Sequence, residues 1–112
     1  MARFIIVIAV LSAAMVTADS QTQQVRSVRP KAGFVPNAET AVKVGEAVLM
    51  PVYGEEKIVG ERPFKATLQG DVRTVAGTLH CEGPPGTTCP GGTAVVKISK
   101  TSGQILFMMH YK

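Results

Sequence analysis

Residues 37–54 read NAETAVKVGEAVLMPVYG, and this stretch decides the fold. Asn37 is a favourable N-cap, Glu39 places a negative charge where it suits the helix dipole, and Gly54 suits the end of a helix. Pro51 lacks an amide donor and crowds the preceding turn, so the last turn should kink or form a separate short turn. The apolar residues recur at helical spacing, which predicts an amphipathic helix: Ala38, Ala41, Val42, Gly45, Val48, Leu49, Val52 and Tyr53.

Beyond this helix the pattern changes at Pro63, where the apolar period falls to two, the spacing of strands. One more helical turn is expected before it, at residues 55–60. A single long helix must cover the sheet that these strands form, so we predict an α+β domain with an N-terminal amphipathic helix packed on a four-stranded antiparallel meander sheet. Val48, Leu49, Phe64 and Val96 are its expected core. The strands are predicted at residues 64–69, 72–79, 93–99 and 104–110.

Upstream of the helix, the sequence opens with Arg3 and a charge-free apolar stretch that turns polar at residue 17. A membrane-spanning helix needs about 20 apolar residues, so this stretch is too short to span and has the pattern of a secretory signal peptide. We place the signal peptide at residues 1–18, with cleavage after Ala18 or, as the second choice, Ala14. An uncleaved anchor or a buried helix is the alternative. Residues 19–35 are predicted to be a flexible polar leader, and residues 36–112 the folded domain.

The charge of the chain does not favour nucleic acid as its partner. Its 12 Lys and Arg against 8 Asp and Glu give a net charge of +4, and loss of Arg3 with the signal peptide would leave +3. The basic residues are spread along the chain without a run that would suit a phosphate backbone. We therefore expect no nucleic-acid partner, and no membrane contact once the signal peptide is removed.

The two cysteines, Cys81 and Cys89, enclose seven residues rich in Gly, Pro and Thr. In an exported protein, the preferred interpretation is a disulfide. A reduced pair or a metal site, with His80 and His110 as further ligands, is the alternative, although zinc would require four ligands.

Motifs that would carry catalysis are missing from the sequence. It contains no glycine-rich phosphate loop, no serine nucleophile elbow and no His pair at helical spacing. Glu55 and Glu56 are adjacent, so they point in different directions and are expected to be solvated. His80 and His110 fall at strand ends that a meander would keep apart. We therefore expect no enzyme activity, cofactor or metal.

Several segments together resemble one known family, the nuclear transport factor 2 fold immunity proteins of bacterial polymorphic toxin systems. The resemblance spans residues 34–112 and is carried by the order and spacing of short motifs. These are VPNAETA at 35–41, AVLMPVYGE at 47–55, PFKATL at 63–68, GTL at 77–79, GGTA at 91–94, ISK at 98–100, GQI at 103–105 and HYK at 110–112.

The resemblance implies an exported protein, in the bacterial periplasm or secreted, that binds and neutralises a cognate toxin protein. Arg73 stands where the family usually has Trp, Tyr111 stands where Gly is common, and the loop between the cysteines is longer than usual. The alternatives are a small-ligand-binding or enzymatic periplasmic domain with a pocket between helix and sheet, and a structural envelope protein. The residues expected to contact a partner are Arg73, His80, Glu82, His110 and Tyr111.

Overall fold

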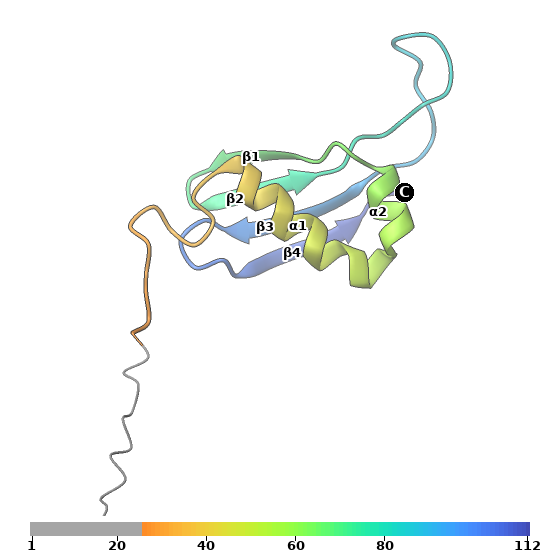
Figure 1. The fold of residues 1–112 in the computed structure, drawn as a ribbon. Coiled ribbons are helices and arrows are strands. Elements are labelled where there is room, and N and C mark those ends of the chain that lie inside the picture. Colours follow the sequence, from red (N-terminus) through yellow and green to blue (C-terminus); the bar gives the residue numbers. More distant parts are fainter. Residues whose placement is uncertain (1–25) are drawn as a thin grey trace, which may run out of the picture.

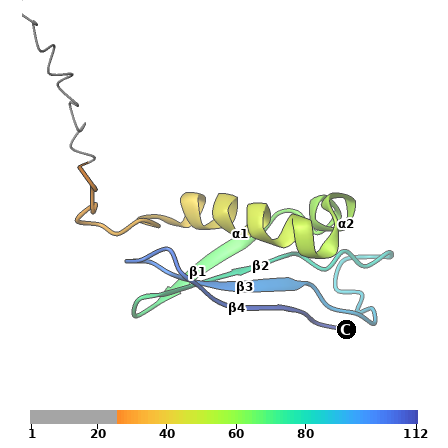
Figure 2. The same cartoon turned by 90° about the horizontal axis from the view of Figure 1, so that it is seen from below.

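The structure is a computed structural model that describes residues 26–112. The signal peptide and the start of the leader predicted at residues 1–25 lie outside this part. Two helices form one layer and a four-stranded antiparallel sheet forms the other (Figures 1 and 2). The elements are α1 (Ala38–Tyr53), α2 (Glu55–Gly60), β1 (Lys65–Gln69), β2 (Val72–Ala76), β3 (Ala94–Ser99) and β4 (Ile105–His110). This is the predicted α+β arrangement, in which a helix packs on a four-stranded antiparallel sheet.

Helix α1 begins and ends where the sequence indicates. The Asn37 side chain accepts a hydrogen bond of 2.8 Å from the Thr40 amide, which satisfies one of the free donors of the first turn. Gly54 has a φ of 96° and its amide bonds to the Met50 carbonyl at 2.8 Å. Pro51 lies within the last turn of the helix, which continues to Tyr53 before α2 starts.

The strands follow the order β1-β2-β3-β4, so the sheet is the predicted meander. Strand β2 ends at Ala76, three residues earlier than predicted. The cause lies at Thr78, whose amide bonds to the Glu61 carbonyl at 2.7 Å and whose hydroxyl bonds to the Pro63 carbonyl at 2.6 Å. These bonds direct the chain toward the segment after α2 instead of continuing the strand.

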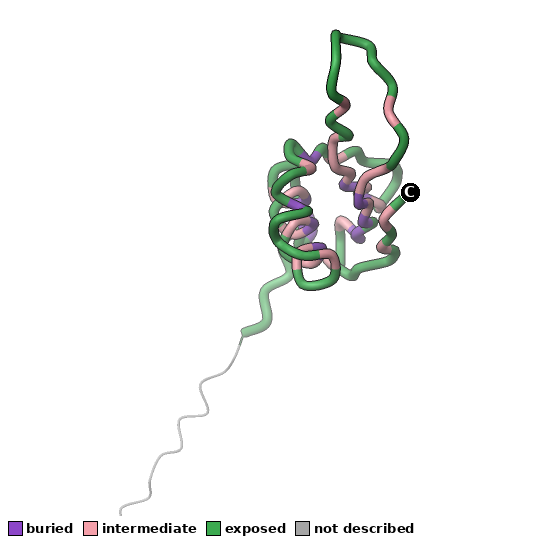
Figure 3. The backbone as a smooth tube through the Cα atoms, turned by 90° about the vertical axis from the view of Figure 1, so that its right-hand side faces the viewer, coloured by how far each residue is buried: buried purple, intermediate pink, exposed green. Residues whose placement is uncertain are grey.

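The core lies between α1 and the sheet (Figure 3). Leu49, Phe64 and Val96 are buried as predicted, and Val48 is half-buried against them. A Cβ added at Gly45 would lie 2.8 Å from a methyl group of Val75, so glycine is needed for the helix to approach this closely. The predicted apolar face was too wide at its two ends: Ala38 and Val52 are exposed.

The ordered domain begins earlier than residue 36. Val35 is buried in the core, and its amide bonds to the Lys100 carbonyl at 3.0 Å. A Cβ at Gly33 would collide with the same carbonyl. The C-terminal end of the segment predicted as a flexible leader, residues 19–35, is thus hydrogen-bonded to the β3–β4 turn.

Arg73 holds the segment that precedes α1, and it does so from the interior of the protein. Its side chain donates to the carbonyls of Val35 and Pro36, both at 2.7 Å, and the residue is only 6% exposed. The guanidinium thereby satisfies two backbone acceptors that precede the helix. Arg73 shares the inward face of β2 with Val75, because alternate strand residues lie on the same face.

Asp71 organises the turns at this same end of the sheet. Its carboxylate accepts hydrogen bonds from the Ser99 hydroxyl at 2.6 Å and from the Thr101 amide at 3.0 Å. The bond from Ser99, followed by those from Thr101, lowers the pKa of Asp71 below its ordinary value. The ionised form of Asp71 therefore holds the β1–β2 and β3–β4 turns together.

Truncation of Leu49 tests the assignment of the helix face. We expect Leu49→Ala to lower the free energy of unfolding by about 2 to 4 kcal/mol, because it leaves a cavity in the core. Val52→Ala is the matched control: Val52 is 60% exposed in the same helix, and its truncation should cost within about 0.5 kcal/mol. Equal losses in urea unfolding would contradict the packing described here.

Candidate functional site

The end of the domain opposite the Asp71 turns gathers the irregular segments of the fold (Figure 1). We call it the loop end. It is made of three parts: the pocket around Glu61 and His110, the disulfide-closed loop of residues 81–89, and Tyr111 after the last strand.

Residues 61–63, which leave α2, tie the elements of the loop end together. The Arg62 carbonyl lies 2.6 Å from Nε2 of His80, and the Glu61 and Pro63 carbonyls bind Thr78. The Arg62 guanidinium donates two hydrogen bonds to the Glu46 carboxylate, at 3.0 and 2.9 Å, in a bidentate contact. This hydrogen-bonded pair raises the pKa of Arg62 above its ordinary value. The segment therefore connects α1, α2 and the chain beyond β2.

The Glu61 side chain lies at the centre of this arrangement. One oxygen accepts the Ala94 amide at 2.6 Å and the other lies 3.0 Å from Nε2 of His110. Nδ1 of His110 is 2.8 Å from the Tyr111 carbonyl, which can only accept, so Nδ1 carries a proton. His110 thereby joins the end of β4 to the Glu61 carboxylate.

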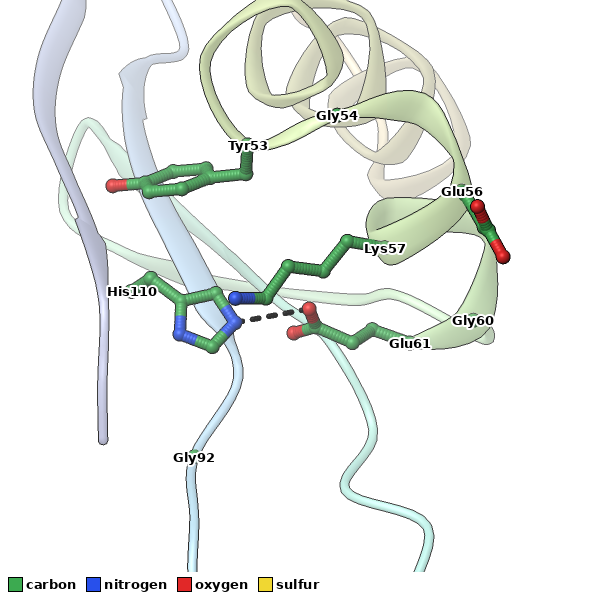
Figure 4. Close-up of a pocket in the computed structure, with 8 residues that line it drawn as sticks. All are labelled: Tyr53, Gly54, Glu56, Lys57, Gly60, Glu61, Gly92 and His110. Atoms are coloured by element: carbon green, nitrogen blue, oxygen red, sulfur yellow. Dashed lines mark hydrogen bonds and ion pairs between the residues drawn. The ribbon is translucent and has the colours of Figure 1, made fainter.

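A pocket of about 680 Å³ opens beside this pair (Figure 4). Tyr53, at the end of α1, and Lys57, on α2, both extend toward His110, whereas Glu56 points away from it. The Tyr53 and His110 rings lie 5.5 Å apart, centre to centre. Lys57 forms no ion pair with any of residues 26–112. The pocket thus offers a cation and a phenol beside the hydrogen-bonded side chains of Glu61 and His110.

The loop between the cysteines projects from the domain (Figure 1). Cys81 and Cys89 form the predicted disulfide, with their Cα atoms 5.5 Å apart. Residues 82–88 are all exposed and add nothing to the core. The Thr87 amide bonds to the Pro84 carbonyl at 3.1 Å, so a turn shapes the tip of the loop.

The structure separates the five residues expected to contact a partner. His80, Glu82, His110 and Tyr111 all lie at the loop end, and their contact with a partner stays a prediction. Arg73 is the exception, because its buried guanidinium is bonded to the backbone near the other end of the sheet. The two histidines contact successive residues, His110 at Glu61 and His80 at Arg62.

Sequence reasoning missed three residues of the pocket, Tyr53, Lys57 and Glu61. Tyr53 was assigned to the buried face of the helix, where its ring is half-buried. Lys57 and Glu61 could have been placed together from their spacing of four, which puts two residues on one side of a helix. No sequence signal joined either residue to His110, which is 49 residues beyond Glu61.

None of the helices within residues 26–112 has the length and apolar character that a membrane crossing requires. That part of the chain also contains no group of three or more His, Cys, Asp or Glu side chains arranged to hold a metal ion.

The comparisons with known proteins agree with this architecture. The sequence model of the family described as NTF2 fold immunity protein matches residues 40–112, which cover most of α1, all of α2 and all four strands. The chain therefore belongs to the NTF2 fold immunity protein family, and this supports an immunity role. No curated protein and no solved structure matches the chain.

Removal of the Glu61 carboxylate tests its place at the centre of the loop end. We expect Glu61→Ala to lower the free energy of unfolding by about 1 to 3 kcal/mol, because the buried Ala94 amide loses its acceptor. Glu61→Gln keeps an acceptor oxygen and should lose less. Glu56→Ala, on the exposed side of α2, is the control. A Glu61→Ala loss no larger than that of Glu56→Ala in urea unfolding would contradict this role.

Proposed function

We propose that this chain is an exported immunity protein that binds a cognate toxin protein and neutralises it. The observation that carries the proposal is the family match over the whole sheet and most of α1. The role is binding rather than turnover: a stable complex blocks the toxin, and the chain itself transforms no substrate.

The loop end supports the proposal because part of it has no evident task within the fold. The side chains of residues 82–88 are exposed, yet a disulfide and a turn restrict the backbone. A backbone that is already restricted loses less conformational entropy when a partner binds, so binding costs less free energy. A restricted, projecting loop is thus suited to contact another protein.

Export to the periplasm or beyond fits the same features. A disulfide persists in oxidising compartments and is rare in the cytosol. The predicted signal peptide at residues 1–18 would deliver the chain there, where it would meet a toxin arriving from a neighbouring cell.

Co-expression tests the proposal directly. The toxin encoded beside this chain's gene, directed to the periplasm, should arrest growth, and co-production of the full chain should restore it. The purified toxin domain should also bind the mature chain in a titration. Growth arrest that persists, together with no measurable binding, would overturn the proposal.

The disulfide offers a test of the loop. We expect Cys81→Ser/Cys89→Ser to lower the free energy of unfolding by at most about 3 kcal/mol, since the closed loop is short. Affinity for the toxin domain should fall further than this stability loss explains, because the free loop must be ordered on binding. Thermal unfolding and titration of the same variant separate the two effects. Unchanged affinity would place the interface away from the loop.

The pocket supports a second candidate function, the binding of a small anion such as a carboxylate. Its volume of about 680 Å³ lies within the range of ligand sites. Lys57 and Tyr53 would supply a charge and a hydrogen bond. A thermal-shift screen of small carboxylic acids tests this: stabilisation that Lys57→Gln abolishes would support it, and no stabilisation by any acid would overturn it.

A further inference from the structure

The sheet has one face that neither helix covers (Figure 2). Val75 and Val96 face α1, as their contacts with the Gly45 position show. Residues one position away along each strand must therefore face the opposite side. The registers align them in two rows across the four strands. The first row is Lys65, Ala76, Val95 and Met109, and the second is Thr67, Thr74, Lys97 and Phe107.

We call these two rows the open face. Its apolar part is concentrated at the β4 side, where Phe107 is 40% exposed and Met109 is 42% exposed. Tyr111, one residue beyond β4, is 48% exposed. The open face thus continues through Tyr111 to the loop end. Exposed apolar residues gathered in this way are typical of protein-binding surfaces.

The charges of the open face are of one sign. Its only ionisable side chains are Lys65 and Lys97, both exposed, and the ammonium of Lys97 lies over the Phe107 ring at 5.5 Å. The acidic side chains of residues 26–112 lie elsewhere: Glu39 and Glu46 in α1, Glu55 and Glu56 in α2, then Glu61, Asp71 and Glu82 in connecting segments. The helices thus carry both signs of charge, because Lys43 and Lys57 lie among their four acidic residues, whereas the open face carries lysines alone.

We propose that the open face binds the toxin, and that the toxin surface which it contacts carries both carboxylates and apolar side chains. This inference rests on the proposed function and names the surface and the chemistry of the partner. The toxin would place carboxylates against Lys65 and Lys97 and apolar side chains over Phe107 and Met109. The loop end would then contact the same partner through the continuity at Tyr111.

Charge reversal on the open face tests the proposal with the purified toxin domain encoded beside this gene as the probe. We expect Lys65→Glu and Lys97→Glu each to raise the dissociation constant at least about tenfold, because the new carboxylates would repel those of the toxin. The matched control is Lys43→Glu, which makes the same change of charge on α1, where Lys43 pairs with Glu39. It should leave the affinity unchanged within about twofold. Met109→Ser tests the apolar part without a change of charge and should also weaken binding.

Two readouts keep these results separate from misfolding and from failure of the proposed function. Lysine acetylation of the wild-type complex, read by mass spectrometry, should protect Lys65 and Lys97 but not Lys43, with no variant needed. Association should also slow as salt is added, because charges of opposite sign attract the partners. A wild-type chain that binds the toxin with Lys65 and Lys97 still reactive would overturn the open-face assignment alone. A wild-type chain that does not bind would overturn the proposed function and this inference with it.

Discussion

Close contact between α1 and the sheet at Gly45 is the constraint on which the rest of the structure depends. A side chain there would meet Val75 and Val96, so the helix can approach this closely only at a glycine. The approach concentrates the buried apolar surface on one side of the sheet, with Leu49 and Ile58 among the fully buried residues. Because the described chain supplies one helical layer, the opposite face stays uncovered. The same contact therefore gives the domain its core and leaves a surface for another molecule.

The two ends of the sheet differ in how their polar groups are hydrogen-bonded. At one end, Asp71 and Arg73 satisfy the backbone and hydroxyl groups of the turns and of the entry to α1. At the other end, Glu61 joins β3 to His110 while its carbonyl holds Thr78. The first set is directed inward and is complete within the domain. The second borders an open pocket and a projecting loop, so its groups lie beside surface that another molecule can reach.

The sequence predicted the elements well because their signals are local. Helical spacing, the Asn37 cap and Gly54 fixed α1, and period-two alternation with two turns fixed the meander. The errors arose where distant contacts decide the outcome. Strand β2 stops early because Thr78 bonds to the segment after α2, and Val35 is ordered because a turn some 65 residues later receives it. Neither contact leaves a periodic trace in the chain.

The candidate site was predicted in part for the same reason. His80 and His110 were expected at strand ends, but the pairing of His110 with Glu61 depends on the tertiary fold. Arg73 was expected to reach a partner because it departs from the family pattern. Its position two residues before Val75 placed it on the inward face, where its guanidinium donates hydrogen bonds to the carbonyls of Val35 and Pro36.

The loop of residues 82–88 adds no side chain to the core, and its ends are joined covalently. Replacement of its sequence, or a change in its length, would therefore leave the burial that stabilises the domain intact. Mutations can accumulate there without the loss of stability that limits change elsewhere in a small protein. Descendants of one such chain could diverge in the partner they recognise while they keep the same scaffold, so recognition and folding are free to evolve separately.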